Sequence, residues 1–155
     1  MAGNIEARLK DLNIELPTPP APVASYVPYV VSGKLIFISG QVTMAADGLK
    51  YVGTVGKELT LVDGQAAARL CAINVLAQAK AAVGGDLDTI ARCVRLGVFV
   101  NATPGFTQHP EVANGASNLI VEVFGDAGRH ARAAVGAGSL PRNVAVEVEA
   151  VFELK

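Results

Sequence analysis

The sequence predicts an α+β fold in which two long helices pack on one face of a sheet. Two helical stretches each carry an apolar face that needs a partner, and the strand-like runs mostly meet through short turns. The chain is 155 residues long, the usual size of one domain, and contains no internal repeat. We therefore expect residues 1–155 to form a single domain.

Residues 1–28 predict a short helix followed by an extended tether. Ile5, Leu9 and Leu12 follow the i, i+4, i+7 spacing of a helix, and Asn4 can cap it. Five prolines in the second half of this segment exclude a regular helix there. The tether is too short to separate two domains.

Residues 29–83 predict a strand pair and then a long helix. The strand pair turns at Ser32-Gly33-Lys34, and its second strand ends at Ser39-Gly40. Residues 61–83 change to a helical period, and the helix ends at Gly84-Gly85. The inward face expected for this helix comprises Ala66, Leu70, Ile73, Ala77 and Ala81.

Residues 90–125 predict a central strand followed by the second long helix. Residues 90–101 are densely apolar and β-branched, which favours a strand over a helix. The helix is expected to begin near Pro110 and to end between Gly125 and Gly128. Its expected inward residues are Val112, Ala116, Leu119 and Val123.

The last quarter of the chain predicts a β-hairpin with arms 131–138 and 143–152. Along the second arm, one face is apolar and the other carries Glu147 and Glu149. An antiparallel pairing of the arms would place Arg132 roughly across from Val148 or Glu149, close enough for a cation and a carboxylate to share one pocket.

These charged residues allow two interpretations. Arg132 is either a solvated charge at a strand end or, flanked by small alanines, a clamp that binds a carboxylate with two parallel hydrogen bonds. Glu147 and Glu149 either lie on the solvent-exposed face of an edge strand or belong to the same carboxylate-binding pocket as Arg132.

Charge and composition narrow the classes of partner. Charged residues make up 17% of the chain and hydrophobic residues 51%, which favours a surface buried in a homo-oligomer. A net charge of −1 gives no basic field for nucleic acid. No apolar run is long enough to span a bilayer and no signal peptide is visible, so a cytoplasmic protein is expected.

Cys71 and Cys93 are expected to be buried thiols rather than a disulfide.

Motifs for metals and organic cofactors are poorly represented, so no cofactor is expected. The chain has two histidines, His109 and His130, and neither belongs to a spaced set of ligands. Gly53-Thr-Val-Gly-Lys57 is too short between its glycines to be a phosphate loop. No nucleophile motif such as G-x-S-x-G occurs.

Three segments together resemble one known family. They are Ala131-Arg-Ala-Ala-Val-Gly-Ala-Gly-Ser-Leu-Pro141 with Val146-Glu-Val-Glu-Ala-Val151, Ile36-Phe-Ile-Ser-Gly-Gln-Val42, and the helix and strand of residues 65–101. From Tyr26 to Phe152 the chain resembles the reactive intermediate deaminase family, RidA or YjgF, whose members were earlier labelled translation-inhibitor endoribonucleases. The resemblance implies a chorismate-mutase-like α+β subunit, a homotrimer, and three clefts between subunits.

The resemblance also implies roles for particular residues. Arg132 would clamp the carboxylate of a small 2-imino or enamine acid, and Glu147 would hold the attacking water. Tyr26, Ser39, Gly40 and Asn114 match positions that line the cleft. Ala134 stands where the family usually has a cysteine, so that only a backbone N–H is retained there, and residues 106–130 are longer than in the best-known deaminases, as in a separate branch.

The preferred hypothesis is therefore the cofactor-independent hydrolysis of reactive imines to 2-oxo acids and ammonia. The first alternative is a non-catalytic trimer that binds small carboxylate metabolites through the same arginine. The second is an endoribonuclease, which no basic or aromatic cluster supports.

Overall fold

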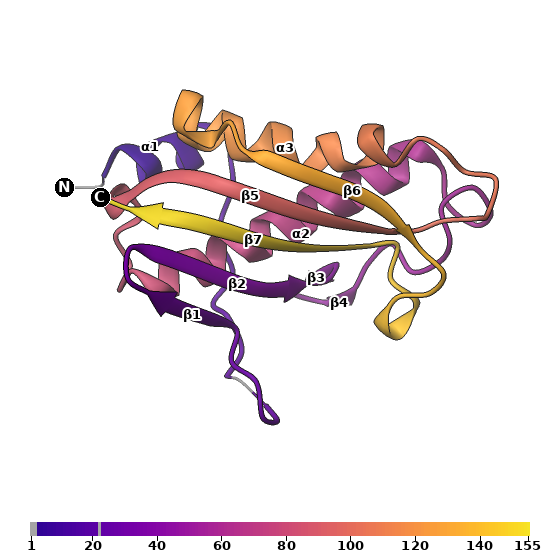
Figure 1. Cartoon of the computed structure of the whole chain (residues 1–155), viewed down its shortest axis with the longest axis horizontal. Coiled ribbons are helices and arrows are strands. Elements are labelled where there is room, and N and C mark those ends of the chain that lie inside the picture. The colour runs from indigo at the N-terminus through magenta and orange to yellow at the C-terminus, as the bar shows by residue number, and fades with distance from the viewer. Residues whose placement is uncertain (1–2, 22) are drawn as a thin grey trace.

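The computed structural model describes residues 3–21 and 23–155 and contains one five-stranded sheet with helices on one face (Figure 1). The two long helices are packed against each other as well as on the sheet, and the short α1 lies beside α3. The α+β class and the position of the helices are therefore as predicted. In sheet order the strands are β1 (Tyr29–Ser32), β2 (Leu35–Gln41), β7 (Val146–Leu154), β5 (Ile90–Asn101) and β6 (Ala131–Ala137); the helices are α1 (Asn4–Asp11), α2 (Leu61–Ala82) and α3 (His109–Phe124); β3 (Met44–Ala45) and β4 (Gly48–Leu49) form a separate pair.

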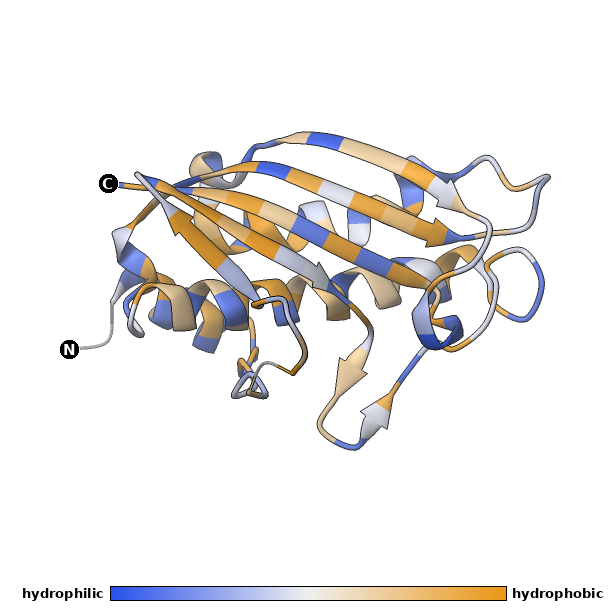
Figure 2. Ribbon diagram, turned by 60° about the horizontal axis from the view of Figure 1, so that its bottom comes forward, coloured by the Kyte–Doolittle hydropathy of each residue, from blue (hydrophilic) through white to orange (hydrophobic). Residues whose placement is uncertain are grey.

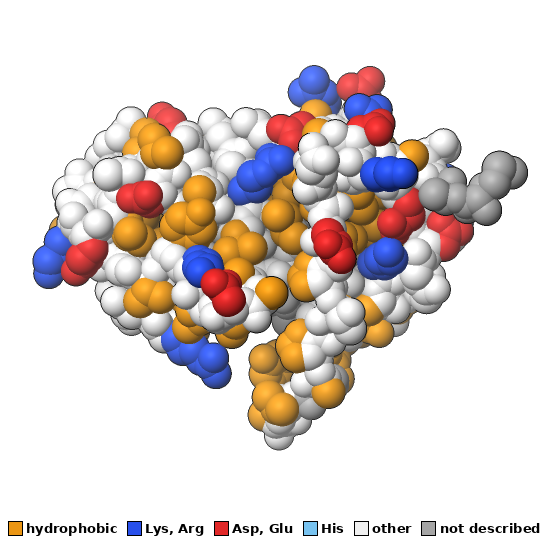
Figure 3. Space-filling model, turned by 180° about the vertical axis from the view of Figure 1, so that it is seen from behind, with side chains coloured by type: hydrophobic (Ala, Val, Ile, Leu, Met, Phe, Trp, Pro, Cys, Tyr) orange, Lys and Arg blue, Asp and Glu red, His pale blue; other side chains and the backbone are white. Residues whose placement is uncertain are grey.

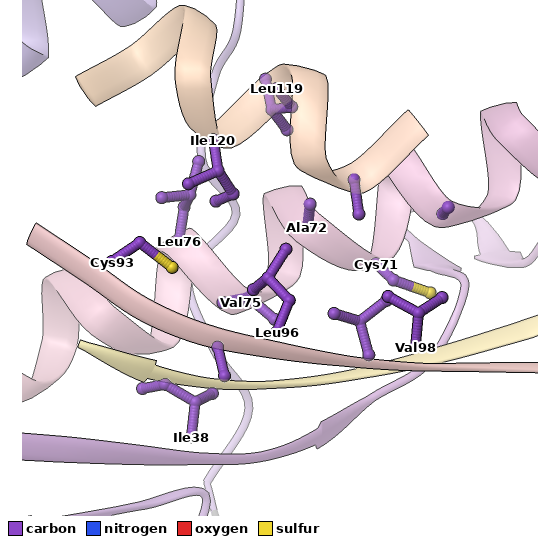
Figure 4. Close-up of a cluster of buried hydrophobic side chains, with 14 of the residues drawn as sticks. Ile38, Cys71, Ala72, Val75, Leu76, Cys93, Leu96, Val98, Leu119 and Ile120 are labelled. Atoms are coloured by element: carbon purple, nitrogen blue, oxygen red, sulfur yellow. The ribbon is translucent and has the colours of Figure 1, made fainter. Parts of the chain in front are cut away.

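The hydrophobic core fills the space between the sheet and the two long helices (Figure 4). Burial of these apolar side chains is the main favourable term in folding. The predicted inward residues of α3 are all buried, and so is the predicted apolar face of β7. The core includes Ile36, Ile38, Val75, Leu76, Leu96, Val98, Leu119, Ile120, Val148 and Phe152.

The predicted inward face of α2 is largely wrong, and Ala77 is the one predicted residue on it that is buried. Leu70 and Ile73 are only partly buried, whereas Ala68, Ala72 and Val75 are fully buried. This helix is apolar around most of its circumference, so the spacing of its apolar residues could not choose one face.

The predicted C-terminal hairpin is also wrong. Strand β6 pairs in parallel with β5, and β7 pairs antiparallel with the other edge of β5, so β5 lies between them. The physical reason is that most positions of β5 are buried, and its backbone N–H and C=O groups are satisfied by a strand on each side. Residues 138–145 make the crossing, with Arg142 and Asn143 at positive φ and the N–H of Ala145 donated to the carbonyl of Tyr51 at 2.9 Å.

Helix α1 lies where it was expected, but its cap is not Asn4. The N-cap position is Gly3, and the Asp88 carboxylate accepts the free backbone N–H groups of Asn4 at 2.7 Å and Ile5 at 2.9 Å. A side chain distant in sequence thus caps the helix and attaches it to the turn before β5.

The proline-rich tether has no regular secondary structure in its described residues, as predicted, while Pro22 lies outside them. Its last part protrudes from the body of the molecule and carries exposed hydrophobic side chains (Figure 3). Val23 and Tyr26 are 75% and 65% exposed. The protruding segment therefore presents apolar surface away from the core.

Both cysteines are buried and free, which confirms the prediction of two buried thiols rather than a disulfide. Burial raises the pKa of the Cys93 thiol to about 12 and also raises that of Cys71. Among the described residues, none of the helices has the length and apolarity needed to cross a membrane.

Candidate functional site

The sheet face opposite α2 and α3 is called the open face here, because no helix or strand in residues 3–21 and 23–155 covers it. Hydrophobic and hydrophilic residues alternate along its strands (Figure 2). Phe37 and Val135 on this face are 45% and 46% exposed, which is high for large apolar side chains in a sheet. The cross-strand rows of the open face are Phe37–Val151–Arg95, Glu149–Gly97–Ala133 and Glu147–Phe99–Val135.

Two carboxylates stand in the middle of the open face, and their surroundings differ. Glu149 is paired with Arg95 at 3.3 Å, and Gly97 makes room for it, since a Cβ there would lie 2.7 Å from Glu149 Oε1. Glu147 has no ion-pair or hydrogen-bond partner among the described residues. Burial raises the pKa of Glu147, and the neighbouring charge of Glu149 raises it further.

Glu147 lies against the end of β2, where the tether is fastened. Any side chain at Gly40 would overlap the Glu147 carboxylate. Ser39 donates its hydroxyl to the carbonyl of Val27 at 2.7 Å, which holds the tether next to Tyr26 against the strand. Tyr26, Ser39, Gly40 and Glu147 are called the Glu147 half-site here.

Arg132 lies on the opposite side of the sheet, between β6 and α3. Its Nη1 donates to Asn114 Oδ1 at 2.9 Å and to Ser117 Oγ at 3.1 Å. Both hydrogens of Nη1 are thereby engaged, whereas Nε and Nη2 have no partner among the described residues. These two nitrogens form one edge of the guanidinium, which can bind a carboxylate through two parallel N–H bonds.

His130 continues this network. Its Nδ1 lies 2.6 Å from the carbonyl of Gly128, which can only accept, so Nδ1 carries the proton. Its Nε2 lies 2.9 Å from Ser117 Oγ and accepts the serine hydroxyl. Burial lowers the pKa of His130, and the charge of Arg132 lowers it further against the opposing effect of the Gly128 carbonyl.

Asn114, Ser117, His130, Arg132 and Ala134 are called the Arg132 half-site here. Ala134 is partly buried and pairs with Val98 on the same side of the sheet as Arg132. The sequence reasoning did not identify Ser117 or His130. Their signal was spacing, because Ser117 lies one helical turn after Asn114 and His130 precedes Arg132 by two residues on the same strand face.

The prediction that Arg132 shares a pocket with a carboxylate of its own chain is wrong. Arg132 pairs with Leu96, which pairs with Ala150, and this row faces the helices. Glu147 belongs to the open face, and a strand spacing of about 4.8 Å with a rise of about 3.4 Å per residue places the two Cα atoms about 14 Å apart. One chain therefore carries two separate half-sites.

The described residues hold no group of three or more His, Cys, Asp or Glu side chains that could bind a metal ion. The two half-sites offer a cation with a free N–H edge and a carboxylate with a raised pKa.

Residues 6–154 match the family model described as "YjgF/chorismate mutase-like, putative endoribonuclease". Protein TCP17 of Trypanosoma cruzi is 50% identical over 154 residues, which are 99% of this chain and 96% of that protein.

Two solved structures place the chain at different distances from its relatives. The crystal structure of Atu1372 from Agrobacterium tumefaciens, described as having unknown function, is 48% identical, with a TM-score of 0.92 over 98% of this chain and 93% of that one. The YjgF gene product of E. coli is 26% identical, with a TM-score of 0.61 over 89% and 94%.

Proposed function

This chain belongs to the YjgF/chorismate mutase-like family, and from that premise we propose that it hydrolyses reactive 2-imino or enamine acids to 2-oxo acids and ammonia. The reaction takes place in clefts between the subunits of a homotrimer and uses no metal or organic cofactor. Each cleft combines the Arg132 half-site of one subunit with the Glu147 half-site of a neighbour.

The free edge of the Arg132 guanidinium carries this proposal. Asn114 and Ser117 hold Nη1, so the Nε and Nη2 hydrogens point in a fixed direction and have no acceptor among the residues that the structure describes. An arginine in this arrangement is suited to a planar carboxylate, which accepts both hydrogens at once. A small acid with one carboxylate therefore fits the Arg132 half-site.

The Glu147 half-site supplies the second component. An unpaired carboxylate whose pKa is raised by burial is a good general base near neutral pH. The exposed apolar side chains on the open face support its burial against another copy of the chain. Such an assembly brings a glutamate of one subunit within reach of an arginine of another, which a lone subunit cannot do.

The chemical steps need only these groups and water. An enamine first becomes its imine tautomer, and Arg132 holds the carboxylate so that the C=N carbon lies next to a water bound by Glu147. Glu147 takes a proton from this water as the oxygen bonds to carbon, and the proton is returned to the nitrogen. The hydroxyl proton of this adduct then passes through Glu147 to the nitrogen, the C–N bond breaks as the C=O bond of the 2-oxo acid forms, and ammonia leaves.

A non-catalytic carboxylate-binding trimer is the second candidate. It is favoured by the free Nε and Nη2 edge of Arg132, which can bind a carboxylate by itself. This function would need the Arg132 half-site alone. Calorimetric binding of a 2-oxo acid without any imine hydrolysis would favour it. The endoribonuclease function named in the family description has no support from a net charge of −1.

The proposed hydrolysis is tested with Arg132→Ala in a coupled assay, in which 2-iminopropanoate is generated within the reaction mixture. We expect kcat/KM to fall by roughly 10²-fold or more, because each hydrogen bond to a charged group contributes roughly 1.5–3 kcal/mol. Arg8→Ala, which removes an exposed arginine on α1, is the matched control. Light scattering checks that the oligomer is intact, and unchanged turnover in Arg132→Ala would refute the assignment.

A further inference from the structure

We propose that Ser117 and His130 are positioning residues that hold the Arg132 guanidinium in the orientation needed to bind a substrate carboxylate. This inference rests on the proposed role of Arg132 in carboxylate binding. It gives a function to two side chains that neither composition nor spacing had identified as part of a site.

The hydrogen bonds of this network run in one direction. Arg132 Nη1 donates to Ser117 Oγ at 3.1 Å, and Ser117 Oγ lies 2.9 Å from His130 Nε2. Because the serine oxygen accepts from arginine, its own hydrogen is free to be donated to the imidazole. His130 Nδ1 then donates to the carbonyl of Gly128 at 2.6 Å, where the chain of bonds ends on the backbone.

The Gly128 carbonyl, at which this series of hydrogen bonds ends, belongs to a well-packed part of the fold. Gly128 is buried at the end of the short 3-10 helix Gly125–Gly128, which packs on α3 and β5. Position 128 requires glycine, since a Cβ there would lie 2.5 Å from the carbonyl oxygen of Ile120. The network therefore transmits the position of the backbone to the arginine through two side chains.

Fixing one nitrogen by two acceptors also fixes the plane of the guanidinium. Asn114 and Ser117 both accept from Nη1, and all five N–H bonds of the group lie in one plane. With both acceptors in place the free edge, Nε and Nη2, has one direction. Without the serine, the guanidinium keeps one hydrogen bond, to Asn114, and can rotate about it. The arginine side chain, which has about 2 kcal/mol of rotamer entropy, then loses its preorganisation.

His130 must be neutral for this arrangement. A protonated imidazole would present an N–H to Ser117 and would place a second positive charge beside Arg132. Burial together with the charge of Arg132 lowers the pKa of His130, which keeps the lone pair on Nε2 available. The electrostatics and the geometry of the network thus agree.

The test measures KM, kcat and the Kd of pyruvate for variants of these two residues. His130→Ala is expected to raise KM and Kd by about fivefold to tenfold, the loss of one hydrogen bond to a charged network, with a smaller change in kcat. His130→Gln, whose Oε1 can accept from Ser117, is expected to restore both to within about twofold. Ser117→Ala should reproduce His130→Ala, which keeps the test valid if one variant fails to fold.

A double-mutant cycle separates positioning from a general structural role. In an Arg132→Ala background, His130→Ala should change the Kd no further, because the residue on which it acts is absent. An equal effect of His130→Ala with and without Arg132 would overturn the inference, and so would a His130→Gln variant as weak as His130→Ala. If wild-type protein binds pyruvate but hydrolyses no imine, the proposed function fails while the binding cycle still decides this inference. Absence of binding to the wild type would overturn both.

Discussion

Mixed oligomers of two inactive variants test whether each cleft is built by two subunits. Within one subunit, Arg132 and Glu147 lie on opposite faces of the sheet and cannot act on one small molecule. Chains carrying Arg132→Ala and chains carrying Glu147→Gln, each with its own affinity tag, are co-expressed. Two successive affinity steps then isolate oligomers that contain both chains.

The expected activity follows from the geometry of a cyclic trimer. A cleft is intact when its arginine comes from a Glu147→Gln chain and its glutamate from an Arg132→Ala chain. In a ring of three, both mixed compositions contain one such cleft, so mixed trimers should show about one third of the wild-type activity. Either variant alone should show almost none.

The assay is the turnover of 2-iminopropanoate, and mass spectrometry confirms that both chains are present. If Arg132 and Glu147 instead acted within one subunit, every site in the mixture would lack one group. Mixed trimers with no more activity than the separate variants would therefore refute the two-subunit cleft.

Three further predictions concern single sites. Glu147→Gln should raise Tm at neutral pH, because the raised pKa means that the charged form is unfavourable in the fold; the gain should disappear as pH falls through that pKa in a calorimetric series. Asp88→Ala should lower the free energy of unfolding in urea by about 1–2 kcal/mol, because the N–H groups of Asn4 and Ile5 lose their acceptor; an unchanged urea midpoint would contradict this. Gly40→Ala should lower kcat more than it changes KM in steady-state kinetics, because its Cβ would displace the Glu147 carboxylate, and wild-type kcat would rule out this contact.

The sequence was sufficient for elements whose pattern is strongly one-sided. The buried face of α3 followed from Val112, Ala116, Leu119 and Val123, and that of β7 from its alternating valines, because each places apolar residues on one side only. Helix α2 was found but not oriented, since alanine around its circumference leaves no single apolar stripe. Periodicity can assign a face only where the faces differ.

Strand pairing was the largest error, and its cause is topological. Adjacent strands with a short link favour a hairpin, but residues 138–145 are long enough to cross one strand. The apolar composition of β5 had already predicted a central strand, which needs a neighbour at each edge. Giving that observation more weight than the turn residues would have placed β6 and β7 on either side of β5.

The candidate site residues stay a prediction, and the sequence did not give their arrangement. Arg132 was selected for its small neighbours and Glu147 for its place in a valine-rich strand and for the family resemblance, yet which sheet face each occupies depends on the pairing. Ser117 and His130 were missed because their spacing from Asn114 and Arg132 points to a site only once the fold brings α3 and β6 together.

The charges of the two half-sites indicate which kind of ligand could bind to both of them at once. On the open face Arg95 balances Glu149, so Glu147 remains as one uncompensated negative charge, and Arg132 makes no ion pair within the described residues. Covering Glu147 with apolar surface alone would be strongly unfavourable, because a buried charge needs a partner or water. In the proposed cleft, a 2-imino acid protonated on nitrogen would offer a carboxylate to Arg132 and a cation to Glu147. A 2-oxo acid would lack the cation and leave Glu147 unpaired again, so under this proposal the same charges that hold the substrate would favour release of the product.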